Sequence, residues 1–311
     1  MLVRMWPLTG SDTTLARRKD TPRRTCPRTI STHGSWGRPS RHSRHHPTGD
    51  HMMPMQQPLT YHAFVELATA DPAVVGLVLK GSRAHDDMIT EHSDHDLYVV
   101  LADSATTDLT RFTGHRTPEL DLVIAPLAEF RAAGMPGFER YALARARLVL
   151  DRLDGGIAQI LAAKARLDAD EAFRDSGEWL DAYANSLYRS VKNDRDGHSL
   201  AARLDAADSI RFLLELLFAL DRRPRPYNKY LEWELTRYPL PGWDTGMLLD
   251  AADRISATGD VPLQRHLFAH VEAAARRAGH SAVLDAWGKD LDLMRLRIPC
   301  SPSICTAATA G

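Results

Sequence analysis

Three aspartates stand where they could support metal-dependent chemistry. Asp96 begins DLYVVLA, an apolar run with the composition of a buried strand, and Asp94 lies two residues before it. Side chains alternate along a strand, so residues two apart point to the same face. Asp121 lies in a second such run, on the face opposite to Leu120 and Leu122. Carboxylates on neighbouring strands can share Mg²⁺ ions, which bind substrate phosphates, as two-metal displacement at phosphorus requires.

A glycine-serine pair stands where a phosphate group could be held. Gly81 and Ser82 follow VVGLVLK, a β-branched run over residues 74–80 that predicts a buried strand. A glycine there lets the backbone approach a ligand closely, and exposed amides at the start of a helix can hold phosphate oxygens. The pair therefore predicts a phosphate cradle. The alternative for the aspartates is a set of solvated turn residues, because Ser-Asp-x-Asp is also a common polar sequence.

The order and spacing of these residues resemble a known superfamily. Gly81-Ser82, then Asp94-His95-Asp96 before an apolar strand, and a later Asp121 are similar to the nucleotidyltransferases of the DNA polymerase β type. A looser resemblance, through NSLYRSVKNDRDGHSLAARLDAADSIRFLLELLFALDRRPRPYNKYLEWEL, links the second half to the helical domain of antibiotic-modifying bacterial nucleotidyltransferases. Together the two cover most of residues 74–235. Many members carry a second glycine at the position of Asp86, where this chain departs from the pattern.

The resemblance implies a reaction and a role for each motif residue. Asp94 and Asp96 would bind Mg²⁺, with two ions expected, and Asp121 would be a third ligand or would activate the acceptor hydroxyl. Gly81 and Ser82 would hold the triphosphate of ATP or another nucleoside triphosphate. The acceptor hydroxyl would attack the α-phosphorus and release pyrophosphate. The protein's task in such a reaction is mainly positioning and electrostatic stabilisation.

Two groups in the second half are weaker candidates for nucleotide binding. Arg189 and Lys192 lie on one polar stripe of a predicted helix, where they could clamp the triphosphate or form a solvated basic face. Tyr227 and Lys229 lie in a proline-rich turn that could present them to a ligand. The alternative for this turn is a simple helix start, with Trp233 as a core anchor.

The acceptor is expected to be a small molecule with a hydroxyl group. The acidic body of the protein favours a cationic acceptor, such as an aminoglycoside-like antibiotic, with acidic walls supplied by four candidates: Glu178, Asp181, Glu232 and Glu234. Adenylylation of a protein or RNA partner, as in toxin–antitoxin pairs, and a non-catalytic nucleotide-binding regulator stay open as alternatives. His85, His92 and His95 are interpreted as exposed loop histidines rather than zinc ligands, because no cysteine lies nearby.

The composition of the 311 residues narrows the class of protein. With 44% hydrophobic and 25% charged residues, the chain is not mainly disordered. Its longest apolar stretch, residues 210–220, is interrupted by charges, so no membrane span is expected. No secretory signal and no disulfide framework are evident, which predicts a cytoplasmic protein. Residues 1–50 carry a net charge of +7 and the rest −8, so a broad nucleic-acid footprint is not expected. The oligomeric state stays open.

The pattern of elements predicts an α+β protein, with a small mixed-sheet nucleotidyltransferase domain followed by an α-helical bundle. Apolar runs predict strands over residues 74–80, 96–102, 120–125 and 146–152, and helical periodicity dominates from residue 168 onward. The last helices are expected over 245–257, 263–278 and 282–296. The predicted parts are a disordered basic tail (1–57), the nucleotidyltransferase domain (58–166), a helical domain that binds substrate or nucleotide (167–296) and a loose tail (297–311).

Overall fold

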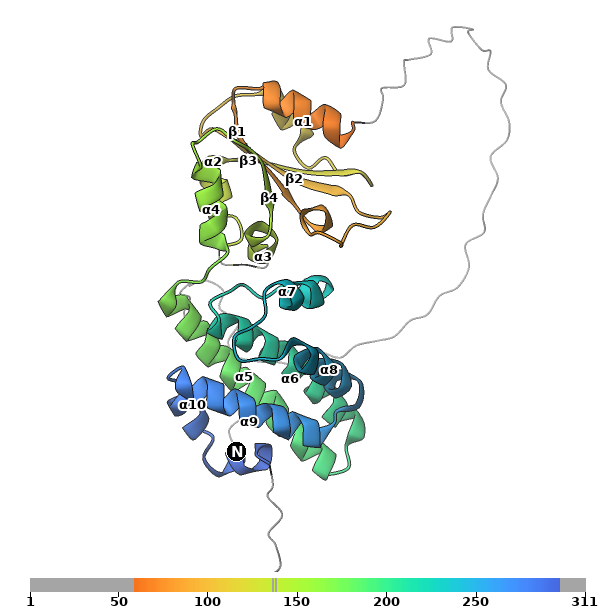
Figure 1. Ribbon diagram of the computed structural model, residues 1–311, viewed down its shortest axis with the longest axis vertical. Helices are drawn as coiled ribbons and strands as arrows, with labels where there is room; N and C mark the ends of the chain where they lie inside the picture. The colour runs from red at the N-terminus through yellow and green to blue at the C-terminus, as the bar shows by residue number, and fades with distance from the viewer. Residues whose placement is uncertain (1–58, 136, 138, 297–311) are drawn as a thin grey trace, which may run out of the picture. The chain divides into compact units, whose positions relative to one another are not determined.

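The computed structural model describes residues 59–135, 137 and 139–296 (Figure 1). All of them belong to one compact unit, Gln57–Gly311. The two predicted tails, over 1–57 and 297–311, lie outside the described residues. Among the helices of the described part, none is both long and apolar enough to cross a membrane.

A four-stranded mixed sheet forms the first half, which we call the sheet half (residues 59–165). Each of the four predicted runs forms a strand: β1 (Val74–Lys80), β2 (His95–Leu101), β3 (Leu120–Pro126) and β4 (Arg147–Asp151). Their order is β3-β2-β1-β4, with β1 antiparallel to both neighbours and β2 parallel to β3. The connection between the parallel strands carries a short 3-10 helix, η2 (Asp108–Phe112). The α+β prediction is therefore confirmed.

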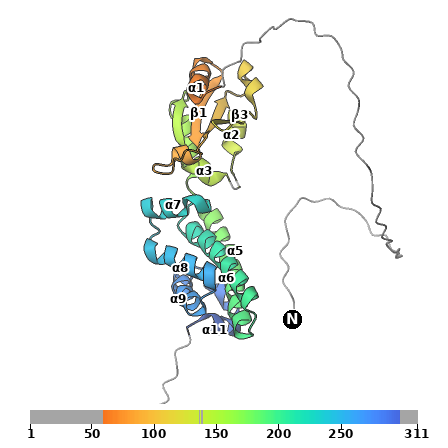
Figure 2. The ribbon, with the colours of Figure 1, turned by 90° about the vertical axis from the view of Figure 1, so that its right-hand side faces the viewer.

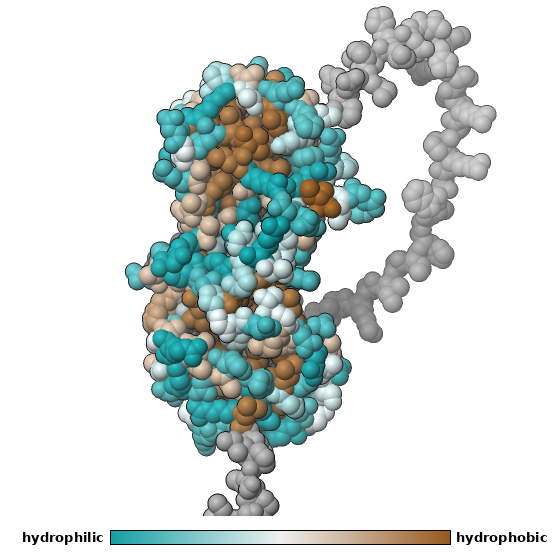
Figure 3. All heavy atoms as spheres, in the orientation of Figure 1, coloured by the Kyte–Doolittle hydropathy of each residue, from teal (hydrophilic) through white to brown (hydrophobic). Residues whose placement is uncertain are grey.

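Helices cover both faces of the sheet, as the alternation of its apolar residues requires. They are α1 (Tyr61–Ala70), α2 (Leu127–Ala132), α3 (Arg140–Ala144) and α4 (Gly156–Lys164). Leu97 and Val99 pack with Phe64 of α1, whereas Tyr98 and Val100 face the opposite cluster, which includes residues of α2, α3 and α4. On the edge strand β4, Leu148 and Val149 stay exposed, and Figure 3 shows an apolar area over this half.

A helical bundle forms the second half, the helical half (residues 166–296). Its members are α5 (Ala169–Arg195), α6 (Ser199–Leu220), η3 (Asn228–Tyr230), α7 (Leu231–Arg237), α8 (Thr245–Thr258), α9 (Val261–Arg277), α10 (Ser281–Asp285), η4 (Gly288–Asp290) and α11 (Leu291–Met294). Helices α5 and α6 lie side by side (Figures 1 and 2). The Asp168 side chain accepts a hydrogen bond from the Glu171 amide and starts α5. The predicted last helix, 282–296, is instead three short pieces, because Gly288 adopts a left-handed φ of 54°.

The predicted boundary between residues 166 and 167 falls in the short link between α4 and α5. Hydrogen bonds cross this boundary in several places. Arg140 of α3, for example, pairs with Glu171 of α5, and Arg145 donates to Glu234 of α7. A division into two domains therefore stays a prediction, and the halves are used here only as names for parts of the chain.

Candidate functional site

The three aspartates meet at one end of the sheet. The parallel register of β2 and β3 places Asp96 directly opposite Asp121, and Asp94 precedes β2 by one residue. One carboxylate oxygen from each residue lies within 4.8 Å of the other two, and all three side chains are partly buried. Burial raises the pKa of Asp96; the Lys80 ammonium opposes this rise, and the charges of Asp94 and Asp121 add to it. Three carboxylates this close are suited to holding a divalent cation between them.

Lys80 is a member of the site that the sequence did not reveal. The antiparallel register of β1 and β2 pairs it with Asp96. Its Nζ lies 3.7 Å from Asp96 Oδ1 and 3.3 Å from Glu139 Oε1, and its side chain is 16% exposed. Glu139 also accepts a hydrogen bond of 2.8 Å from Tyr98. The only sequence signal for Lys80 is that a charged residue ends an otherwise apolar strand.

Gly81 forms a turn that no other residue could form without strain. Its φ of 72° lies in the left-handed region, and its ψ is −158°. A Cβ atom at this position would lie 2.0 Å from Asp96 Oδ2, far inside van der Waals contact. The backbone at Gly81 therefore lies directly against one of the carboxylates.

Ser82 begins a single 3-10 turn, η1 (Ser82–Ala84), and its side chain is buried. Its hydroxyl donates a hydrogen bond of 2.9 Å to Ser93 Oγ, the residue before Asp94. Arg83 Nε donates to the Ser93 carbonyl oxygen at 2.9 Å. The Ser82 side chain therefore ties the glycine turn to the segment that leads into the aspartates.

The interpretation of the three histidines as exposed loop residues is wrong for His85 and for His95. His85 is 1% exposed, and its ring stacks on Tyr230 with centroids 4.1 Å apart. His95 is the first residue of β2 and stacks on Tyr61, also at 4.1 Å. His92 is exposed. The aromatic partner that buries His85 comes from a segment 145 positions further along the chain, which local sequence patterns cannot reveal.

Tyr227 lies near the carboxylates, and the binding of a nucleotide by Tyr227 and Lys229 stays a prediction. Burial raises the pKa of Tyr227 to about 12, and the charges of Glu139 and Asp96 contribute to the rise. The Lys229 ammonium lies 5.4 Å from the centre of the Tyr230 ring. The turn over residues 227–230 therefore lies close enough to the carboxylates to feel their charge.

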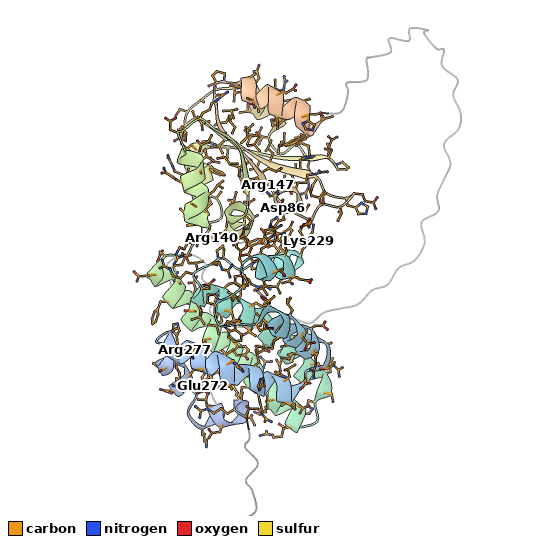
Figure 4. The ribbon with its side chains drawn as sticks, viewed as in Figure 1. Asp86, Arg140, Arg147, Lys229, Glu272 and Arg277 are labelled. Atoms are coloured by element: carbon orange, nitrogen blue, oxygen red, sulfur yellow. The ribbon has the colours of Figure 1, made fainter. Side chains whose placement is uncertain are left out.

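Trp233 differs from its expected role as a core anchor. Its side chain is only partly buried, and its Nε1 donates a hydrogen bond of 2.7 Å to the main-chain oxygen of Asp86. The Asp86 carboxylate binds Arg147 of β4 and lies 3.5 Å from Arg237 Nη2 of α7 (Figure 4). Through these contacts Asp86 joins the segment that follows the glycine turn to α7 and β4.

Arg189 and Lys192 are not brought to the carboxylates. Arg189 Nη2 lies 3.1 Å from Asp205 Oδ1, and Lys192 Nζ lies 5.9 Å from the Tyr188 ring centre. Glu171, which pairs with the sheet half, is 18 residues before Arg189 in the same helix, and at 1.5 Å per residue this amounts to about 27 Å. A lysine or arginine side chain cannot span that distance. The expected clamp from this stripe is therefore corrected.

The four predicted acidic walls do not form one surface. Glu234 is fully buried and accepts hydrogen bonds from Arg145, Arg223 and Tyr141. Asp181 accepts from Trp287 Nε1 at 3.1 Å, whereas Glu178 and Glu232 are exposed. None of these four belongs to the cavity that adjoins Tyr227.

That cavity has a volume of about 350 Å³ and lies where α5, α6 and the turn over residues 224–227 meet. Its lining includes the Trp179 ring and charged groups of both signs: three carboxylates, of Glu171, Asp175 and Glu215, and four guanidinium groups, of Arg140, Arg211, Arg223 and Arg225. Burial raises the pKa of Glu215, the Arg225 and Arg211 charges oppose the rise, and the Asp175 charge adds to it. Arg225 Nη1 lies 3.8 Å from Glu215 Oε1, too far for a hydrogen bond.

Comparisons with known proteins add little to this geometry. No protein-family model matches the sequence, and no curated protein does. Among solved structures, a nucleotidyltransferase-like protein from Exiguobacterium sibiricum 255-15 is 14% identical, with 74% of this chain and 76% of that chain covered and a TM-score of 0.37. At that TM-score the likeness carries no argument about function.

Proposed function

We propose that this protein is a Mg²⁺-dependent nucleotidyltransferase. It transfers a nucleoside monophosphate, AMP from ATP in the favoured case, to a hydroxyl group of a small acceptor and releases pyrophosphate. The observation that carries the proposal is the close approach of the Asp94, Asp96 and Asp121 carboxylates at one end of the sheet, with Asp96 directly against the Gly81 turn.

The donor set fits the metal that the reaction needs. Mg²⁺ prefers oxygen ligands and usually binds one or two carboxylates together with waters and substrate phosphates. The proposed ligands Asp94, Asp96 and Asp121 offer only carboxylate oxygens. When bound, Mg²⁺ would neutralise charge on the phosphate oxygens.

The side chains around the aspartates divide the remaining work. In the proposal, the Gly81 turn and the Lys229 ammonium hold the triphosphate, and Ser82 keeps the turn in place through Ser93. Asp121 orients the acceptor hydroxyl and takes its proton, because it lies at the outer edge of the trio on β3. Lys80 limits the repulsion between Asp96 and Glu139.

The cavity beside Tyr227 is the proposed site for the acceptor. Asp175 and Glu215 line it, and the Trp179 ring adds an aromatic wall that favours a cation. Four guanidinium groups line it as well, from Arg140, Arg211, Arg223 and Arg225, and these can donate hydrogen bonds to oxygen atoms of an acceptor. This mixed lining supports a polar acceptor with both hydroxyl and amine groups, of which an aminoglycoside-like antibiotic is one example.

The test of the reaction removes the proposed metal ligands. Asp94→Asn combined with Asp96→Asn should abolish Mg²⁺-dependent pyrophosphate release from ATP in the presence of a panel of amino sugars. Asp194→Asn, an exposed aspartate near the far end of α5, is the matched control and should keep full activity. Normal turnover by the double variant would refute the metal assignment.

The role of Asp121 needs a separate comparison. Asp121→Asn should lower turnover by about 10²–10⁴-fold, the usual loss of a general base. Its nucleotide dissociation constant, measured with Mg²⁺ present, should change much less, because the lost interaction belongs mainly to the transition state. A variant with normal turnover would show that Asp121 is an ordinary strand aspartate.

A further inference from the structure

The peptide of Gly81 is held by one buried side chain. His85 Nδ1 lies 2.8 Å from the Gly81 carbonyl oxygen. A carbonyl oxygen can only accept a hydrogen bond, so His85 carries a hydrogen on Nδ1 and donates it. The carbonyl belongs to the residue whose Cα lies against Asp96. Its orientation therefore affects the position of the turn relative to the carboxylates.

The His85 ring is itself fixed by residues of the helical half. The Tyr230 ring stacks on it with an interplanar angle of 5°, and the Trp233 ring meets it edge-on at 4.6 Å. On its other side, Nε2 lies 3.3 Å from the Tyr141 hydroxyl, which is also 3.1 Å from Glu234 Oε2. The ring is thus held at Nδ1 by its bond to Gly81, and two of its aromatic neighbours, Tyr230 and Trp233, lie in η3 and α7.

These contacts form a continuous path from α7 to the glycine turn. The Tyr141 hydroxyl donates a hydrogen bond to Glu234, and its oxygen contacts Nε2 of His85. Nδ1 of His85 donates to the Gly81 carbonyl oxygen. The ring is too deeply buried to touch a ligand. Any effect of His85 on a nucleotide must therefore act through the Gly81 peptide.

We propose that His85 is a positioning residue, which sets the orientation of the Gly81 peptide and thereby the affinity of the turn for the triphosphate. The inference rests on the proposed function, because it assumes that the turn binds a nucleotide. It adds that the helical half affects nucleotide affinity through this hydrogen bond, which the Gly81 carbonyl oxygen accepts in addition to one from the Ala84 amide at 3.1 Å.

Two substitutions separate the hydrogen bond from the packing of the ring. In His85→Asn the side-chain amide nitrogen can take the place of Nδ1 and keep the donor to Gly81. In His85→Gln the amide reaches the place of Nε2, and the donor to Gly81 is lost. Both variants lose the stack on Tyr230, so packing affects them alike.

The measurement is the dissociation constant of α,β-methylene-ATP with Mg²⁺, by calorimetry on the full chain, together with the melting temperature. We expect His85→Gln to bind about fivefold more weakly than His85→Asn, because one hydrogen bond contributes about 1 kcal/mol. The melting temperatures of the two variants should fall by similar amounts. Equal affinities in both variants would overturn the proposal, since only ring packing would then matter.

A measurement on the unmodified protein covers the case in which both variants fail to fold. In protein labelled with ¹⁵N-histidine, the nitrogen shifts of His85 should report a hydrogen on Nδ1. A hydrogen on Nε2 alone would overturn the proposal.

The wild-type measurement distinguishes this inference from the proposed function. If the wild-type protein binds no α,β-methylene-ATP, both fail. If it binds and the Asn and Gln variants behave alike, only the role of His85 fails.

Discussion

Asp96 is the residue on which the site depends most. One of its oxygens faces Lys80 and the other lies against Gly81. It also stands opposite Asp121 in the register of the parallel strands. A substitution at any of these neighbours should therefore alter the position or charge of a carboxylate in the proposed metal site.

Gly81→Ala should disturb this arrangement in two ways. The φ of 72° strains any residue with a side chain, and the new methyl group would clash with Asp96 Oδ2. We expect a loss of about 1–3 kcal/mol in the free energy of unfolding, together with loss of pyrophosphate release. Urea denaturation and the activity assay measure the two effects.

Gly197→Ala is the matched control for this substitution. Gly197 has a φ of 81°, and a Cβ atom there would meet nothing within 4 Å. Gly197→Ala should lower the free energy of unfolding only through the strained φ, without a clash, and it should keep full pyrophosphate release. If both variants lost the same share of pyrophosphate release, the contact between Gly81 and Asp96 would have no functional role.

Sequence analysis identified site residues whose arrangement follows from their spacing along one strand. It did not identify residues whose role depends on partners far away in the sequence. The spacing of Asp94 and Asp96 predicts a shared strand face, because the period of a strand is two. Lys80 depends on the antiparallel register with β2, which no local pattern specifies. His85 depends on Tyr230, which is brought to it only by the complete fold.

At the scale of the elements, the strands and long helices agree with their apolar patterns. The position of a residue along its helix, however, decides which parts of the molecule its side chain can contact. Arg189 and Lys192 lie on a helix, as their spacing predicts, and this helix is α5. Periodicity shows which residues share a face, and it says nothing about which end of the helix contacts the sheet half. That end is occupied by Glu171 through its pair with Arg140.

Two lysine substitutions test this difference between elements. Lys229→Met, in η3, should weaken binding of α,β-methylene-ATP about five- to thirtyfold, because a charge-assisted contact to phosphate contributes about 1–2 kcal/mol. Lys192→Met, in α5, should leave the dissociation constant unchanged. Calorimetry with Mg²⁺ present measures both, and equal weakening would return Lys192 to the site.

At the scale of the whole molecule, Glu234 joins the two halves of the chain. It is fully buried in α7, and Arg145 Nε donates to its Oε2 at 2.8 Å from a position 89 residues away. Arg223 Nη1 lies 3.1 Å from its Oε1. Removing one member of a buried ionic group leaves the others uncompensated.

Glu234→Gln should therefore lower the free energy of unfolding by about 3–5 kcal/mol. Glu232→Gln, an exposed neighbour in the same helix, should change it by less than about 0.5 kcal/mol. Urea denaturation at neutral pH measures both. A small effect at Glu234 would show that the arginines find other partners.

Buried histidines should make the stability depend on pH in the weakly acidic range. Burial lowers the pKa of His85 and of His280 below the ordinary value of 6.5. Between that value and the lower folded pKa, the unfolded chain binds more protons, so stability falls as the pH falls. The melting temperature should be lower at pH 5.5 than at pH 7.5 (roughly one unit on either side of 6.5).

The contribution of one histidine can be isolated by substitution. His280→Gln should reduce the difference in melting temperature between the two pH values, because it removes one such group. His92→Gln, at a side chain that is 87% exposed, should leave the difference unchanged. A wild-type melting temperature that does not fall at the lower pH would contradict the assignment of His85 and His280.

The bond between Trp233 and Asp86 has a consequence for biosynthesis, since it joins residues 147 positions apart. The glycine turn leaves the ribosome early, but the side chains that enclose it are translated much later. At about 5–20 residues per second, the turn waits on the order of ten seconds for its partners. During that interval the His85 ring has neither Tyr230 nor Trp233 to cover it. We expect nascent chains that end before residue 227 to leave this turn open to protease, and chains that have released residue 237 to protect it.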